Sequence, residues 1–149
     1  MRDILIKASG DVTACRDFFD YIAEKAKESY VVLIAGGGTK ISDALVKAGH
    51  AVEFNEHGRV STTDAERKIM RQVLDGEVRR LQKIFTDKRV FVVPPILNVG
   101  KIVIPINGDN LVKAYYLGFS EIYVLTKKTR IKKKEEIFIG FPKVKIVGF

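Results

Sequence analysis

The sequence predicts an α/β fold, a three-layer α/β/α sandwich with a mainly parallel sheet. Short apolar segments alternate along the chain with longer segments that have helical periodicity. The clearest case is Val31–Ala35, five consecutive apolar residues that fit a strand buried on both faces, as in a parallel sheet. Three glycines follow, and Lys40–Ala48 then places Ile41, Leu45 and Val46 on one side of a predicted helix.

The other elements follow from the same periodicities and from turn and capping signals. In chain order we expect a strand over 3–8, a helix over 12–28, an irregular polar segment over 50–60, a helix over 63–85, strands over 89–93 and 101–106, a helix over 107–117 and a strand over 121–126. The strand over 101–106 is expected to pair with 89–93 or to continue beside it. Residues 135–139 and 143–147 alternate like the two strands of a hairpin that turns at Gly140-Phe141-Pro142.

Length and composition indicate one folded domain over residues 1–149. A chain of 149 residues can form one well-buried core, and 46% hydrophobic with 30% charged residues excludes a disordered chain. No apolar run approaches the ~20 residues of a membrane span, and the N-terminus lacks a signal peptide's apolar segment, so we expect a cytoplasmic protein without membrane partners. The single cysteine, Cys15, is expected to be buried in a helix. The absence of Trp and the low Gln content favour a heat-adapted source.

The positive charge is concentrated near the end of the chain. The formal net charge is +8, and Lys127–Lys134 holds six positive side chains in eight residues. Such a run is commonly a solvated, mobile segment, but its charge would also bind nucleotide phosphates or RNA. Few aromatic residues lie among the lysines, which disfavours stacking on nucleic-acid bases.

Polar residues cluster where the predicted strands end. Lys7 and Gly10 follow the first strand, Gly36–Thr39 the second, and Asn107–Asn110 opens a helix after a later one; the run that starts at Lys127 follows the strand over 121–126. Ligands of open α/β sheets bind beyond the carboxyl ends of the strands, so we expect these groups to meet at one edge. The glycines before a helix suit a phosphate or carboxylate, but they also suit a tight strand-to-helix turn without any ligand.

Each candidate residue has a simpler structural interpretation as well. Lys7 fits a solvated lysine at a strand end, Arg59 a surface arginine, and Asn107 and Asp109 fit helix caps. No cysteine and histidine residues have the spacing of metal ligands, so no metal site is predicted.

The order of these motifs resembles the amino acid kinase family, and within it the acetylglutamate kinases. The similar segments are Lys7-Ala8-Ser9-Gly10, Gly36-Gly37-Gly38, Gly58-Arg59-Val60-Ser61-Thr62-Thr63-Asp64-Ala65-Glu66, Asn107-Gly108-Asp109 and Leu125-Thr126. The resemblance implies a carbamate kinase-like fold that is shortened at its C-terminal end, because the family has a C-terminal lobe that holds adenine and a second catalytic lysine. It also implies ATP and Mg²⁺ as cofactors if the protein is active, and a homodimer.

The resemblance assigns roles to individual residues. Lys7 would neutralise the transferred phosphoryl group, and Asp109 would orient lysines around the phosphates; both are the catalytic candidates. Arg59 would hold the carboxylate of an acceptor, which a planar guanidinium suits. The anion-binding candidates are Gly10, Gly36, Gly37, Gly38, Arg59 and Asn107.

Departures from the family pattern leave several functions open. Where the family has an Asp-x-Asp-Gly segment, this chain has Lys127-Lys128-Thr129-Arg130, and Ser9 and Pro105 replace a glycine and an asparagine. One hypothesis is a protein that binds a small anionic metabolite or a nucleotide. A second is a minimal ATP-dependent phosphotransferase acting on a carboxylate, in which the basic run or a partner chain completes the ATP site. The alternatives are a nucleic-acid-binding module that uses Lys127–Lys134 and a dimeric regulatory module. The long helix with Met70, Val73 and Gly76 is the candidate dimer interface.

Overall fold

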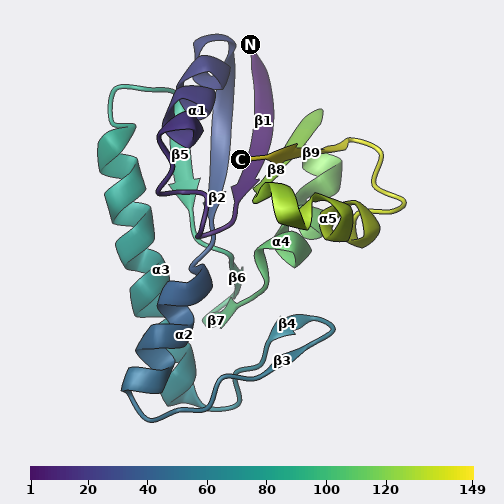
Figure 1. The fold of residues 1–149 in the computed structure, drawn as a ribbon. Coiled ribbons are helices and arrows are strands. Elements are labelled where there is room, and N and C mark those ends of the chain that lie inside the picture. Colours follow the sequence, from purple (N-terminus) through teal and green to yellow (C-terminus); the bar gives the residue numbers. More distant parts are fainter.

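A five-stranded, fully parallel sheet forms the centre of the protein (Figure 1). The computed structural model describes all residues 1–149. The strands lie in the order β5-β2-β1-β8-β9, with bounds β1 Arg2–Ala8, β2 Ser29–Ala35, β5 Val90–Val93, β8 Glu121–Thr126 and β9 Val144–Gly148. Because every neighbouring pair is parallel, the carboxyl ends of all five strands meet at one edge of the sheet.

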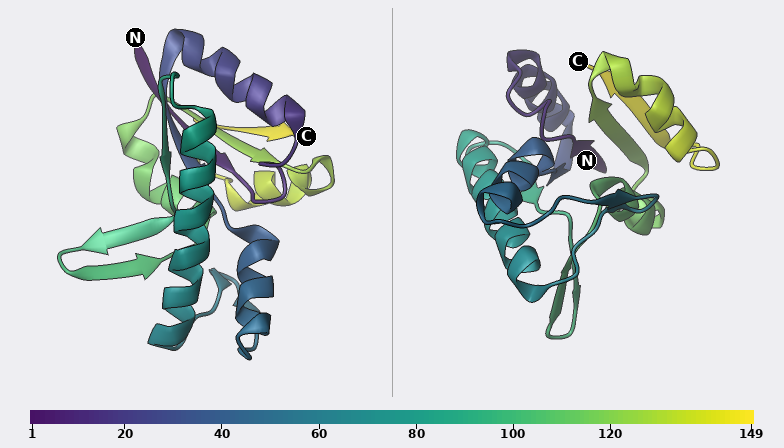
Figure 2. Two further views of the ribbon diagram at one scale, coloured as in Figure 1. Left: turned by 90° about the vertical axis from the view of Figure 1, so that its left-hand side faces the viewer. Right: turned by 60° about the horizontal axis from the view of Figure 1, so that its bottom comes forward.

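Helices cover both faces of this sheet. On one face α1 (Arg16–Glu28) and α3 (Asp64–Ile84) contribute Phe18, Ile22 and Leu81 to the larger core cluster, and Phe85, the C-cap of α3, joins them. On the other face α4 (Gly108–Tyr115) and α5 (Ile131–Ile137) flank a second cluster that contains Leu111, Val112 and Phe138. In the left view of Figure 2, α1 (purple) and α4 (green) lie on opposite sides of the strands. The predicted α/β class and parallel sheet are confirmed, and the layers are compatible with the expected sandwich.

The remaining elements extend from the carboxyl edge of the sheet. Helix α2 (Gly38–Lys47) packs on the first half of α3 through Ile41, Leu45, Met70 and Leu74. A small hairpin, β3 (Phe54–Asn55) with β4 (Gly58–Arg59), lies within the segment that was expected to be irregular. Two short 3₁₀ segments, η1 (Tyr116–Gly118) and η2 (Lys128–Arg130), flank β8.

The expected strand over 101–106 does not join the sheet beside 89–93. Strand β7 (Ile102–Pro105) pairs antiparallel with β6 (Ile96–Val99), and the two form a hairpin that projects away from the sheet (Figure 2). The reason is the turn at Gly100, whose φ of +60° lets the chain reverse between β6 and β7. The strand is present as predicted, but the prediction that it lies beside residues 89–93 was wrong.

The hairpin predicted over 135–147 is also wrong. Residues 131–137 form α5, and β9 pairs in parallel with β8 instead of antiparallel with its preceding segment. A parallel partner needs a crossover, which a helix provides. Ile131 and Phe138 are seven residues apart and face the same side of that helix, so helical spacing was present beneath the apparent alternation. The basic run is therefore ordered in η2 and α5, not a mobile segment.

The expectation for Cys15 changes in the structure. Cys15 is exposed, because residues 11–14 form a turn and α1 begins only at Arg16. Gly76 lies inside α3, but no other backbone of the chain packs against it: a methyl group there would meet nothing within 4 Å. None of the helices has both the length and the apolar character needed to cross a membrane.

Candidate functional site

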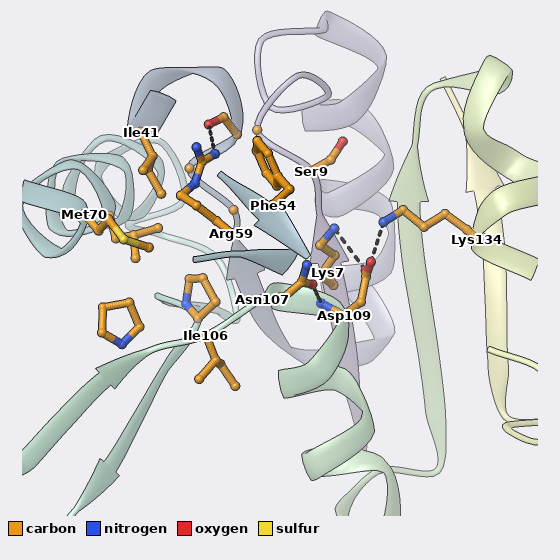
Figure 3. Close-up of a pocket in the computed structure, with 18 of the residues that line it drawn as sticks. Lys7, Ser9, Ile41, Phe54, Arg59, Met70, Ile106, Asn107, Asp109 and Lys134 are labelled. Atoms are coloured by element: carbon orange, nitrogen blue, oxygen red, sulfur yellow. Dashed lines mark hydrogen bonds and ion pairs between the residues drawn. The ribbon is translucent and has the colours of Figure 1, made fainter. Parts of the chain in front are cut away.

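A cavity of about 220 Å³ opens at the carboxyl edge of the sheet (Figure 3). Its walls come from the ends of β1 and β2, the start of α2, the β3–β4 hairpin, the start of α4, and η2 with α5. All the predicted site residues line it: Lys7, Gly10, Gly36, Gly37, Gly38, Arg59, Asn107 and Asp109. The structure thus brings together groups that lie up to about a hundred positions apart in the sequence, as expected from the rule for parallel sheets.

Asp109 lies between two lysines in this cavity. The Lys7 Nζ atom is 3.2 Å from Asp109 Oδ1, and the Lys134 ammonium donates a hydrogen bond to Asp109 Oδ2 (Figure 3). The side chains of Lys7 and Asp109 are each 7% exposed and that of Lys134 is 13% exposed. One buried carboxylate therefore fixes the positions of two ammonium groups and leaves this trio with a net positive charge.

The electrostatics of this trio follow from burial and pairing. Burial lowers the pKa of Lys7, and the neighbouring Lys134 charge acts in the same direction, while the Asp109 carboxylate opposes both. Burial alone would raise the pKa of Asp109, but the Lys7 and Lys134 charges outweigh it and hold that pKa below its ordinary value. Asp109 is therefore ionised at neutral pH and retains both lysines.

The local backbone structure sets the positions of the Lys7 and Asp109 side chains. Lys7 is the next-to-last residue of β1, and its side chain passes over Gly108, where a Cβ atom would lie 2.9 Å from Lys7 Cε. Asn107 caps α4, since its Oδ1 accepts a hydrogen bond from the Asp109 backbone N–H at 2.8 Å. Asp109 then sits in the first helical turn, where the helix dipole favours a carboxylate. The capping interpretation of Asn107 is confirmed.

The glycines that follow β1 and β2 lie in two loops that are in close contact. A Cβ atom on Gly10 would lie 3.1 Å from the Gly37 carbonyl carbon and 3.1 Å from the Gly38 nitrogen, so the loops approach backbone to backbone. The Gly36 N–H donates to the Ala8 carbonyl at 3.1 Å. The backbone N–H groups of Gly10 and Gly37 donate no hydrogen bond within the protein.

Arg59 reaches the cavity from β4. Its Nη1 donates to Ser42 Oγ at 2.6 Å and its Nη2 to the Gly38 carbonyl at 2.9 Å, and its guanidinium stacks over the Phe54 ring at 4.8 Å. Partial burial lowers its pKa, although an arginine keeps its charge at neutral pH. Arg59 bonds only neutral groups, so no carboxylate compensates its charge.

Two basic residues of the cavity, Arg130 and Lys134, come from the run that was expected at this edge, but neither was singled out from the sequence. Both belong to the run Lys127–Lys134, which the sequence analysis treated as one unit. The available signal was the helical spacing of Ile131, Lys134 and Phe138, which places Lys134 on the inward side of α5. Lys133, the preceding residue, is exposed.

The comparisons with known proteins add no family to this geometry. No protein-family model matches the sequence, and no curated protein matches it either. No group of three or more His, Cys, Asp or Glu side chains in the structure could share a metal ion.

Proposed function

We propose that this chain is an amino acid kinase-like protein that binds a nucleotide or another small anionic metabolite in the strand-end cavity. The observation that carries the proposal is Asp109 held between Lys7 and Lys134, beside the free N–H groups of Gly10 and Gly37. Ammonium groups and loop amides at the start of a helix are the donors that proteins use for phosphate oxygens. The kinase-like fold belongs to the same proposal.

The second part of the proposal is phosphoryl transfer to a carboxylate. A carboxylate oxygen of the acceptor would attack the terminal phosphorus of ATP, the bond to the bridging oxygen would break, and ADP would leave. Lys7 and Lys134 would neutralise the charge of the transferred group, and Arg59 would hold the acceptor. In this proposal Lys134, beside Asp109, takes the role that the resemblance gives to a second catalytic lysine.

Mg²⁺, which the resemblance implies together with ATP, does not fit as an ion held by the protein. Hard cations need oxygen ligands, and Asp109 is the one carboxylate among the residues lining the cavity. Both of its oxygens are engaged by lysines. No step of the proposed reaction is therefore assigned to a protein-bound metal.

Calorimetric titration tests the binding proposal. The titrants are ATP, ADP, inorganic phosphate, acetylglutamate and aspartate, each against the wild-type chain and against Lys134→Gln and Lys133→Gln. We expect a phosphate-bearing ligand to bind, and Lys134→Gln to weaken it by about tenfold or more, because a charge-assisted hydrogen bond is lost. Lys133→Gln is the matched control on the exposed side of the same helix. The proposal would be overturned if no anion produced a heat of binding, or if Lys134→Gln and Lys133→Gln reduced the affinity equally.

A nucleic-acid-binding function is the second candidate. It is favoured by the exposure of five positive side chains in and beside η2 and α5, namely Lys127, Lys128, Arg130, Lys132 and Lys133. RNA retention that falls steeply with salt, and is lost when Lys128, Lys132 and Lys133 are all replaced by Gln, would support it. Retention that is unchanged in this triple variant would refute it.

A dimeric regulatory module remains the third candidate. Met70 is buried against α2 within the chain, so an interface on α3 would use the half-buried Val73 and Gly76 instead. Sedimentation measures the association directly, and a monomer at all concentrations would remove this candidate.

A further inference from the structure

We propose that the cavity takes a chain of two or more linked phosphates as a metal-free anion, with Arg130 at its mouth and Lys134 at its base supplying the charge that a divalent cation would otherwise bring. The inference rests on the proposed function, because it specifies the ligand of the same cavity. It also explains why the cavity lacks the carboxylates that would hold the Mg²⁺ implied by the family resemblance.

The charges on the cavity walls are strongly unbalanced. Four basic side chains and one carboxylate line it, a formal net charge of +3. Asp109 compensates only one of Lys7 and Lys134. Arg59 bonds Ser42 and the Gly38 carbonyl, both neutral. Arg130 makes no ion pair and no side-chain hydrogen bond, so its charge is entirely available to a ligand.

This excess fits a ligand with more than one phosphate. A phosphate group carries a charge of about −1.5 to −2 near neutral pH, so a single one leaves the cavity positive. Two linked phosphates match the walls more closely. A Mg²⁺ ion bound to the same ligand would remove two negative charges and reduce that match, and it would gain no carboxylate from the protein in return, since Asp109 is engaged.

The positions of the basic residues fit a linked chain of phosphates. Lys7 and Lys134 are buried at the base of the cavity, whereas Arg130 lines the cavity but is exposed, and so lies at its mouth. Arg130 ends η2, and Lys134 lies four residues further on in α5, so the same rigid segment carries both charges. One phosphate at the base would leave Arg130 unused, while a second would reach it.

Calorimetry with inorganic phosphate and pyrophosphate tests this inference. Each is titrated in EDTA and again in excess MgCl₂. In EDTA we expect the affinity for pyrophosphate to exceed the affinity for phosphate by about tenfold or more. Excess MgCl₂ should weaken the binding of pyrophosphate severalfold. Arg130→Gln should reduce the pyrophosphate affinity by about tenfold and leave the phosphate affinity nearly unchanged. Lys132→Gln, which removes an exposed charge of α5 outside the cavity, is the control.

The outcomes separate the two proposals. If neither anion binds, and ATP and ADP also fail, the proposed function falls and this inference falls with it. If phosphate and pyrophosphate bind equally, if MgCl₂ tightens pyrophosphate binding, or if Arg130→Gln has no effect, only this inference is overturned. Arg130 is exposed, so its variant should fold; an unchanged thermal midpoint confirms that its effect is on binding.

Discussion

Lys134 in α5 and Asp109 in α4 form a buried ion pair that connects the last helix of the chain to the strand-end cavity. The crossover between β8 and β9 is therefore part of the site and does not merely close the sheet. Lys134 is the residue of α5 that lines the cavity, and Arg130 lines it from the position just before the helix. The apolar side of α5 packs against the sheet.

The first prediction concerns this ion pair and stability. Lys134→Gln should lower the free energy of unfolding by about 1–3 kcal/mol, because a buried carboxylate loses one charged partner and keeps only Lys7. Lys133→Gln should change it by less than about 0.5 kcal/mol, as expected for an exposed side chain. Urea unfolding of the two variants measures the difference, and equal midpoints would contradict a buried pair.

The second prediction concerns the contact between the glycine loops. Gly10→Ala should destabilise the protein by about 1–3 kcal/mol, because its Cβ atom would press on the backbone of Gly37 and Gly38, which cannot move as a side-chain tip can. The same shift should weaken anion binding. At Gly118 a Cβ atom meets nothing within 4 Å, so Gly118→Ala is the control. A Gly10→Ala variant with wild-type stability and affinity would show that the loops do not touch.

The third prediction is a stabilising substitution in α3. Gly76→Ala should raise the free energy of unfolding by about 0.5–1 kcal/mol, because alanine has the better helix propensity and nothing packs on this position. Urea midpoints of the monomeric protein measure this gain. If a second copy packs on Gly76, the substitution would instead reduce association in sedimentation experiments, which makes the variant a test of the dimer candidate.

The fourth prediction concerns Glu77, a buried carboxylate of α3. It forms ion pairs with Lys40 of α2 and with Arg80, and the Arg80 guanidinium also contacts the Thr13 hydroxyl at 3.3 Å. Thr13 in turn donates to the Gly10 carbonyl at 3.0 Å, so Glu77 links both glycine loops to α3.

Glu77→Gln should destabilise the protein by about 1–2 kcal/mol and weaken anion binding, since α2 and the Gly10 loop lose a common partner. The pairing charges are partly solvated, which keeps the cost below that of a fully buried pair. Asp75→Asn, which removes an exposed pair with Arg71, is the control and should cost less than about 0.5 kcal/mol. Chemical denaturation with parallel titration of the ligand would separate the two effects.

The fifth prediction concerns stability in acid. Hydrogen bonds from Tyr123, Arg2 and Lys145 lower the pKa of Glu121 to about 2 from an ordinary 4.5. A carboxyl whose folded pKa is depressed stabilises the fold above its unfolded pKa, and this contribution is lost as the pH falls from 4.5 towards 2. Glu121→Gln should therefore unfold with a shallower pH dependence in this range. Parallel acid-unfolding curves for the variant and the wild type would contradict the prediction.

Much of the candidate site was accessible from the sequence because it depends on local patterns and on one topological rule. Three features could each be recognised from a segment of about ten residues. They are the apolar run of β2 with the glycines after it, the Asn107 cap, and the position of Lys7 at the end of β1. The rule that carboxyl ends of parallel strands share an edge then predicts their meeting. Gly10, Arg59 and Asp109 line one cavity with them.

The predictions that were wrong concern elements whose pairing depends on contacts with residues far away in the sequence. Residues 135–139 fit both a period of two and a helical spacing, and only the parallel pairing of β9 with β8 requires the helix. Strand β7 has the composition of a sheet strand, but the turn at Gly100 pairs it with β6.

The sequence by itself determined the α/β class, the order of most elements and the residues that end the central strands, because hydrophobic periodicity and capping are local properties of a chain. Only the tertiary structure decided that Lys134 turns inward to Asp109 while Lys133 stays in solvent. That choice depends on which side of α5 packs against the sheet, and the packed side is fixed by contacts with residues far away in the sequence.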